Sequence, residues 1–198
     1  CTQNLVSKKS WYEDEYLETI AKYKNSELRH EFPKAFASLV IEMEERFSSS
    51  AGNDVLGEFF EVHISNGRSG QYFTPFPICQ FMAMAVQENG NKKKPLRIVD
   101  PTCGSGRMLI ASSKANGPHH EYYGIDIDRT CVKMTALNLF LNGVFGSEVM
   151  CANALMPNDF VIAYRISFVP LGIFKIEIKE DSLLWHLQKN SFAKEKNG

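Results

Sequence analysis

The sequence of 198 residues lacks any apolar run that approaches the roughly 20 consecutive residues needed to cross a membrane. Its first residues, CTQNLVSKKS, are polar and contain no apolar signal-peptide core. It also lacks an excess of either charge, because 22 Lys and Arg oppose 23 Asp and Glu. We therefore expect a cytoplasmic protein that makes no contact with a membrane. Any contact with nucleic acid requires a local basic patch or a separate partner.

The sequence has few cysteines, and they do not form the close pairs that mark zinc sites and redox motifs. The five are Cys1, Cys79, Cys103, Cys131 and Cys151. We expect all of them to be reduced thiols. We assign no metal, because His119 and His120 lie far from any acidic pair at metal-ligand spacing. A first residue that is not Met fits a trimmed chain or a mature lipoprotein, and the motifs described below favour trimming.

The N-terminal part of the chain has apolar residues at helical spacing, which predicts helices over residues 11–50. Asp54 is expected to cap a further helix, and an apolar helix is expected over residues 78–87. The segment NGNKKKP at 89–95 then breaks the pattern, and its lysines are expected to be solvated. We therefore divide the chain into a helical region, 1–95, and a second domain, 96–198.

The second domain alternates strand and helix patterns, which predicts an α/β fold with a parallel sheet and crossover helices. The expected elements are strands at 96–99, 122–125 and 148–151 and helices at 108–114 and 131–141. Ligands of such sheets bind beyond the carboxyl ends of the strands. The first predicted strand leads directly into a glycine turn at such an end.

The turn lies within IVDPTCGSGRMLI, at residues 98–110. Gly104 and Gly106 allow positive φ angles and a close approach of the backbone to a ligand. Asp126 follows Gly106 by twenty residues, at the end of the second predicted strand, where a carboxylate can accept bonds from ribose hydroxyls. Two alternatives remain: a plain connecting turn with Asp126 as a cap, and a dinucleotide site, which CGSG matches less well than G-x-G-x-x-G.

Four segments together resemble the amino-methyltransferases that modify adenine N6 in DNA. They are GQYFTP at 70–75, DPTCGSGRMLI at 100–110, YGIDID at 123–128 and LNLFLNG at 137–143. The similarity covers roughly residues 55–165 and is greatest to the modification subunit of type I restriction-modification systems. It implies a Rossmann-like methyltransferase fold with a helical N-terminal extension, and S-adenosylmethionine as the cofactor.

The resemblance also implies which residues contact the cofactor. Gln71, Tyr72, Phe73, Thr74 and Pro75 would lie against its methionine end, Asp100, Thr102, Gly104, Ser105 and Gly106 would wrap it, Asp126 with Ile127 would hold the ribose, and Asn153 with Ala154 would lie near the adenine ring. Simpler readings stay open for some of these side chains. Asn153 can be a polar turn residue, and Tyr72 and Phe73 can serve ordinary packing.

The chain lacks the catalytic tetrapeptide of that family, Asn or Asp followed by Pro-Pro and Tyr or Phe. The tetrapeptide would directly follow a fourth strand, which we place at 159–163, but the next residues are Tyr164, Arg165, Ile166 and Ser167. Arg165 offers only donors and cannot accept bonds from the target amine. Tyr164 either stacks on a base or fills the emptied pocket. We therefore assign no catalytic residue.

The C-terminal remainder is expected to form a hairpin around Pro170 to Gly172 and then a short amphipathic helix with Leu183, Leu184 and Leu187. It contains no evident target-recognition domain. Two functions stay open. One is a cofactor-binding module that is catalytically incomplete as an isolated chain. The other is an adenine methyltransferase, or a subunit of one, that contacts DNA through a partner subunit.

Overall fold

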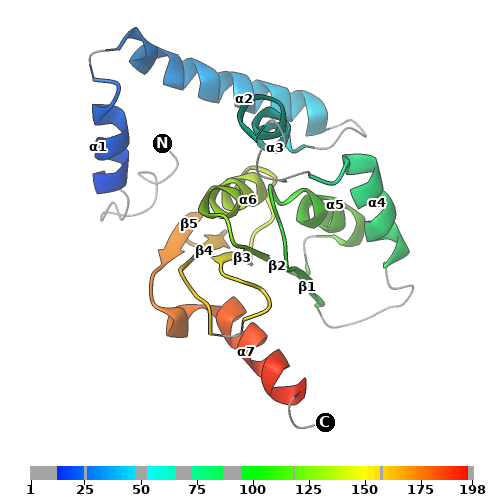
Figure 1. The fold of residues 1–198 in the computed structure, drawn as a ribbon. Coiled ribbons are helices and arrows are strands. Elements are labelled where there is room, and N and C mark those ends of the chain that lie inside the picture. The colour runs from blue at the N-terminus through cyan, green and yellow to red at the C-terminus, as the bar shows by residue number, and fades with distance from the viewer. Residues whose placement is uncertain are drawn as a thin grey trace.

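A five-stranded sheet with the order β1-β2-β3-β4-β5 forms the centre of the computed structural model (Figure 1). The structure describes residues 13–24, 26–47, 53–65, 73–86, 95–117, 119–156 and 158–195. The strands are β1 (Arg97–Asp100), β2 (Glu121–Asp126), β3 (Ser147–Cys151), β4 (Ile162–Ser167) and β5 (Gly172–Ile176). The first three are parallel, whereas β4 and β5 are antiparallel to their neighbours. The sheet is therefore mixed.

The parallel half of the sheet confirms the alternation predicted from the sequence. Helices α5 (Arg107–Asn116) and α6 (Arg129–Leu141) connect the three strands, and each predicted boundary lies within two residues of the observed one. Both crossover helices lie on the same side of the sheet, together with α4 (Phe76–Ala85) (Figure 1). These connections bring the carboxyl ends of β1 and β2 to the same edge of the sheet, beside the glycine turn.

Two hydrophobic clusters cover the two faces of the sheet. Because side chains alternate along a strand, Tyr122 packs with α4, α5 and α6, while its neighbour Tyr123 packs on the opposite face with α7 (Leu183–Glu195). Leu184 and Trp185 of α7 are nearly fully buried there. The predicted C-terminal hairpin and helix are thus confirmed, and the short 3₁₀-helix η4 (Lys179–Asp181) lies between them.

The predicted fourth strand at 159–163 is displaced, because the observed β4 begins three residues later, at Ile162. The observed β4 runs antiparallel to β3, with Met150 opposite Ala163 and Val149 opposite Tyr164. The segment 152–161 that joins the two strands is shorter than the dozen or more residues that a parallel crossover requires. Tyr164 to Ser167 consequently belong to the strand itself and do not follow its end.

The N-terminal part of the chain is helical, as predicted. It contains α1 (Glu13–Ala21), η2 (Glu27–His30), α2 (Glu31–Phe47), α3 (Val55–Phe60), the π-helical turn η3 (Glu61–Ser65) and α4. Asp54 caps α3 through a hydrogen bond from Gly57 N. Helix α4 begins two residues earlier than predicted, because Pro77 is tolerated in the first turn.

Helix α4 packs against α5, so the N-terminal region contacts the second domain near the glycine turn. The division at residue 95 stays a prediction. Within the described ranges, no helix combines the length and apolarity needed to span a bilayer.

Candidate functional site

A cavity of about 380 Å³ lies at the carboxyl ends of β1 and β2. Three parts of the chain form its wall: the segment entering α4, the glycine turn with the start of α5, and the end of β2 with the start of α6. The lining residues are Phe73, Thr74, Cys79, Asp100, Thr102, Cys103, Gly104, Ser105, Arg107, Met108, Asp126, Ile127 and Cys131. The fold therefore brings together residues from three of the four motifs that the sequence analysis quotes.

At two positions the glycine turn has a backbone conformation that residues other than glycine rarely adopt. Gly104 and Gly106 have φ angles of 54° and 85°. A Cβ atom on Gly104 would lie 2.9 Å from the Phe73 ring, and one on Gly106 would lie 2.8 Å from Cγ2 of Thr135. Both positions therefore combine a left-handed backbone with a close neighbour. The glycines allow the turn to pack between the FTP segment and α6.

Asp126 holds this turn on the end of β2. Its Oδ2 accepts a hydrogen bond from Gly104 N at 2.9 Å, and its Oδ1 accepts one from Asp128 N at 2.9 Å. Each carboxylate oxygen has a second lone pair, so the side chain keeps acceptor capacity toward the cavity that it lines. Asp126 is thus more than a helix cap, since Asp128 performs that role for α6.

Asp100 is a second carboxyl group in the cavity wall. It accepts a hydrogen bond from Thr102 N at 3.1 Å. Burial raises the pKa of Asp100 above its ordinary value, and the negative charge of Asp126 acts in the same direction, whereas the Thr102 bond opposes both. The ionised carboxylate would therefore be stabilised by a positively charged group in the cavity.

Asp54 and Arg107 form a buried ion pair at the cavity wall, and no motif in the sequence indicates it. Arg107 Nε donates to Asp54 Oδ2 at 2.7 Å, and the two side chains are 8% and 1% exposed. Asp54 also accepts bonds from Ser105 Oγ and from Asn138 Nδ2. Burial raises the pKa of the Asp54 carboxyl, and the bonds from Ser105 and Arg107 act in the opposite direction. The pair joins the helical region to the glycine turn.

The FTP segment is attached to the same network. Arg107 Nη1 donates to the carbonyl oxygen of Thr74 at 3.0 Å, and the Phe73 ring lies 5.7 Å from the Arg107 guanidinium carbon. Phe73 and Thr74 both line the cavity, while Pro75 is the N-cap residue of α4. Gln71 and Tyr72 lie outside the described residues.

Asn153 and Ala154 do not line this cavity. The Asn153 side chain accepts a hydrogen bond from Leu155 N at 3.0 Å, which is the geometry of a polar turn residue. The carbonyl oxygens of both residues accept bonds from Gln188 of α7. Their predicted place near an adenine ring stays a prediction.

Tyr164 and Arg165 contribute to the packing of the sheet. Tyr164 is 4% exposed and belongs to the core between the sheet and the crossover helices. Arg165 donates to the buried Glu148 at 3.1 and 2.9 Å and to the carbonyl of Asp181. Glu148 in turn accepts bonds from Ser182 Oγ and Leu184 N. Neither Tyr164 nor Arg165 lines the cavity.

Three cysteines stand in the cavity wall as thiols that are hard to ionise. Burial raises the pKa of Cys79 to about 11 and that of Cys131 to about 12, and it raises the pKa of Cys103 strongly. These three and Cys151 form no disulfide in the described part of the chain, and Cys1 lies outside that part. Among the described residues, no cluster of His, Cys, Asp or Glu could hold a metal ion.

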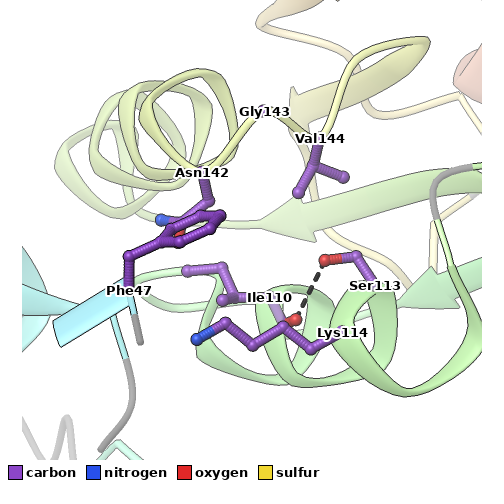
Figure 2. A pocket seen from close by; sticks show the side chains of 7 residues that line it. All are labelled: Phe47, Ile110, Ser113, Lys114, Asn142, Gly143 and Val144. Atoms are coloured by element: carbon purple, nitrogen blue, oxygen red, sulfur yellow. Dashed lines mark hydrogen bonds between the residues drawn. The ribbon is translucent and has the colours of Figure 1, made fainter. Parts of the chain in front are cut away.

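A second, smaller cavity of about 130 Å³ lies between α5 and the end of α6 (Figure 2). Its wall is largely apolar, with Phe47 at the end of α2 on one side and Ile110 and Val144 on others. Burial lowers the pKa of Lys114, which also lines it. None of the predicted site residues reaches this cavity.

Comparison with known proteins identifies the class of protein that this site belongs to. Residues 51–169 match the sequence model of the family described as N-6 DNA Methylase. Because the match covers more than half of the chain, the protein belongs to this family, which includes the adenine methyltransferases of restriction-modification systems.

Individual relatives are methyltransferases of restriction-modification systems. The chain is 30% identical over 118 residues to the type II methyltransferase M.MamI of Microbacterium ammoniaphilum, covering 48% of this chain and 32% of the relative. It is 25% identical over 190 residues to the type II restriction enzyme and methyltransferase RM.BcgI of Heyndrickxia coagulans, covering 86% and 29%. The type I HindI methylase subunit of Haemophilus influenzae is 27% identical over 103 residues.

A solved structure of a type I restriction-modification methyltransferase subunit from Streptococcus thermophilus matches with a TM-score of 0.39 and 22% identity, covering 52% of this chain and 23% of that chain. The chain thus spans about a third or less of the length of the relatives that it matches.

Proposed function

We propose that the cavity at the ends of β1 and β2 binds S-adenosylmethionine. The observation that carries this proposal is the glycine turn, which packs against Phe73 and Thr135 and is held by Asp126 at the end of a parallel strand. The glycine turn and the Asp126 carboxylate, which keeps acceptor capacity, therefore line the same cavity. Family membership supports the same ligand.

The residues present fit such a cofactor. A cavity of about 380 Å³ falls within the range of about 300 to 1,000 Å³ that small-molecule sites occupy. Asp126, with Ile127 beside it, would hold the ribose, and Phe73 and Thr74 would contact the methionine end. Gly104, Ser105, Gly106 and Thr102 would form the wall between them. The cofactor, when bound, supplies an electrophilic methyl group on its sulfonium.

We further propose that the isolated chain binds the cofactor without transferring its methyl group. Tyr164 and Arg165 are engaged in the core and with Glu148, so they offer no acceptor pair to a target amine at the cavity. The chain would then act as a cofactor-binding module of the adenine methyltransferase family. It would work in the cytoplasm. It would reach DNA through a partner, because its net charge of −1 gives little attraction to phosphates.

A second candidate is a subunit that becomes an active adenine methyltransferase when a partner supplies the missing residues. One observation favours it: in the described part of the chain, β1 pairs only with β2, so its outer edge can accept a further strand beside Asp100. The type I relatives are described as methylase subunits, which is compatible with assembly.

Calorimetry with S-adenosylhomocysteine tests the cofactor proposal. We expect measurable binding by the unaltered chain, and Asp126→Ala should weaken it by about 1 to 3 kcal/mol, the loss typical of a hydrogen bond to a charged group. Asp128→Ala is the matched control, because Asp128 caps α6 and does not line the cavity. Equal affinity of both variants and the unaltered chain would remove Asp126 from the ribose role.

A further inference from the structure

The guanidinium of Arg107 has one nitrogen without an acceptor. Its Nε donates to Asp54 and its Nη1 donates to the Thr74 carbonyl oxygen. Its Nη2 is buried and has no hydrogen-bond partner. The carboxylate of Glu61 lies 3.6 Å from Nη2, which is beyond hydrogen-bond length. A buried donor that lacks an acceptor is costly, so such a group calls for an explanation.

The position of Arg107 suggests what would satisfy this nitrogen. The side chain is 8% exposed and yet lines the candidate cofactor cavity. It stands at the end of the cavity formed by Phe73 and Thr74, whereas Asp126 stands where the glycine turn meets β2. An anionic acceptor at the Phe73 end of the cavity would therefore lie beside a guanidinium that is already fixed in place and has one nitrogen without an acceptor.

We propose that Arg107 Nη2 donates to the carboxylate of the amino-acid end of S-adenosylmethionine. This assignment rests on the proposed function, because it requires the cofactor in this cavity. Arg107 is not among the residues that the family resemblance places against the cofactor. The proposal therefore adds a contact residue, and it specifies which group of the ligand that residue contacts. Arg107 thereby distinguishes ligands that carry the amino-acid carboxylate from those that carry only the adenosyl group.

The surrounding charges favour a zwitterion over a phosphate. Asp54 already neutralises Arg107, and Glu61 lies close to it, so a dianion would meet two carboxylates around a single cation. An α-amino acid brings a carboxylate together with an ammonium group. Asp100, in the wall of the same cavity, offers an acceptor for that ammonium. The cavity wall thus presents both charges that an amino-acid end requires.

The network behind Arg107 also keeps the guanidinium rigid. Asp54 is fixed by Gly57 N, Ser105 Oγ and Asn138 Nδ2, which belong to three different elements. Because Asp54 cannot easily move, Arg107 loses little further freedom when a ligand binds. Preorganisation of this kind lowers the entropic cost of binding.

The first experiment uses the unaltered chain and two ligands that differ only in the carboxylate. Calorimetry should show that S-adenosylmethionine binds about 10- to 100-fold more tightly than decarboxylated S-adenosylmethionine, as expected for a hydrogen bond between charged groups. Inorganic phosphate should not compete with either ligand. Equal affinity for the two ligands would overturn the assignment of Arg107 while leaving the adenosyl site in place.

The second experiment alters the residue. Arg107→Lys keeps a cation beside Asp54 but removes the Nη2 donor, so the affinity for S-adenosylmethionine should fall by about tenfold or more. The affinity for the decarboxylated ligand should stay within about twofold. Arg165→Lys is the matched control, because Arg165 also pairs with a buried carboxylate but does not line the cavity. An equal loss for both ligands would make Arg107 a purely structural residue.

Nuclear magnetic resonance keeps the proposal testable if Arg107→Lys fails to fold. In the unaltered, ¹⁵N-arginine-labelled chain, the Nη2 signal of Arg107 should shift with S-adenosylmethionine and not with the decarboxylated ligand. A shift with neither, at saturating ligand, would refute the contact. Failure of the unaltered chain to bind either ligand would instead refute the proposed function, and the assignment with it.

Discussion

At the residue scale, Gly106 is the position where backbone conformation and close packing coincide most sharply. Its φ is 85°, and an added Cβ would lie 2.8 Å from the methyl group of Thr135, a side chain with no exposed surface. Thr135 cannot move away easily, because its Oγ1 donates to the Gly104 carbonyl oxygen at 2.7 Å. The glycine is thus required by its neighbour as well as by its conformation.

Gly106→Ala should therefore destabilise the protein more than a Gly→Ala substitution at a position where only the backbone conformation is unfavourable. Gly146 provides that comparison, since its φ is 72° and an added Cβ would meet nothing within 4 Å. We expect a loss of about 1 to 2 kcal/mol for Gly146→Ala. Gly106→Ala should lose a further 1 to 3 kcal/mol or so from overpacking. Urea unfolding measures both, and equal losses would show that Thr135 gives way.

The pKa of Asp100 gives a second prediction at this scale. A carboxyl group whose pKa is raised by folding binds protons more tightly in the folded state than in the unfolded chain. Its contribution to stability is then present at low pH and is lost as the pH rises from the ordinary value of 3.8 through the raised value. The folded protein should bear this cost in full once the pH exceeds the raised pKa.

Asp100→Asn removes the titration and keeps an oxygen that can accept from Thr102 N. The free energy of unfolding of this variant, minus that of the unaltered chain, should therefore increase between about pH 4 and about pH 7. Urea unfolding at several pH values measures the difference, with Asp181→Asn at an exposed position as the control. A difference that stays constant or falls with pH would contradict the role of Asp100 burial.

At the element scale, the strands and helices that could be predicted are those determined by local sequence. The apolar run before the glycine turn and the helical spacing after it predict β1 and α5, and the same pattern repeats through β3. The direction of β4 could not be read in this way. It depends on pairing with β3 and on the short connection at 152–161, and neither has a local signature in the sequence of β4 itself.

The buried Glu148 links three of these elements. Its carboxylate accepts bonds from Arg165 in β4 and from Ser182 and Leu184 at the start of α7, and it is 1% exposed. Glu148→Ala leaves these donors without an acceptor. We expect it to cost about 2 to 4 kcal/mol of unfolding free energy, less than a fully buried pair because the Arg165 side chain is 39% exposed.

Glu121→Ala is the matched control for this prediction. Glu121 pairs with Arg97 at 2.8 Å, but the two side chains are 38% and 60% exposed, so its loss should cost less than about 1 kcal/mol. Urea unfolding compares the two variants. Neither residue lines the cavity, so ligand affinity should be retained in both. Similar losses in the two variants would mean that Glu148 does not stabilise the antiparallel half.

At the scale of the whole molecule, the candidate site could be predicted only in part. The glycine turn, Asp126 and Phe73 belong to recognisable motifs, and the fold brings them to one cavity. The Asp54–Arg107 pair joins residues 53 positions apart, and no local pattern connects them. The place of Asn153 near an adenine ring, which the resemblance implies, stays a prediction; in the structure its side chain accepts a bond from Leu155 N and its carbonyl oxygen accepts one from Gln188 of α7.

The last prediction concerns methyl transfer, which requires two parts of the molecule at once. The cavity can hold a methyl donor, but a target amine must also meet a pair of hydrogen-bond acceptors that align its lone pair with the methyl group. Tyr164 to Ser167 lie within β4, where Tyr164 packs in the core and Arg165 binds Glu148. Binding without alignment gives little rate, because effective molarity depends on near-attack geometry.

We therefore expect the isolated chain to incorporate no methyl group into DNA, even at cofactor concentrations that saturate its site. The assay uses tritiated S-adenosylmethionine with single- and double-stranded DNA of mixed sequence, and a known adenine methyltransferase shows that the substrates are competent. Gly104→Asp is the matched variant, because a side chain there would meet the Phe73 ring and fill the turn. Incorporation by the unaltered chain that disappears in Gly104→Asp would establish transfer at this cavity. The acceptors would then have to come from the backbone or from side chains other than those of β4.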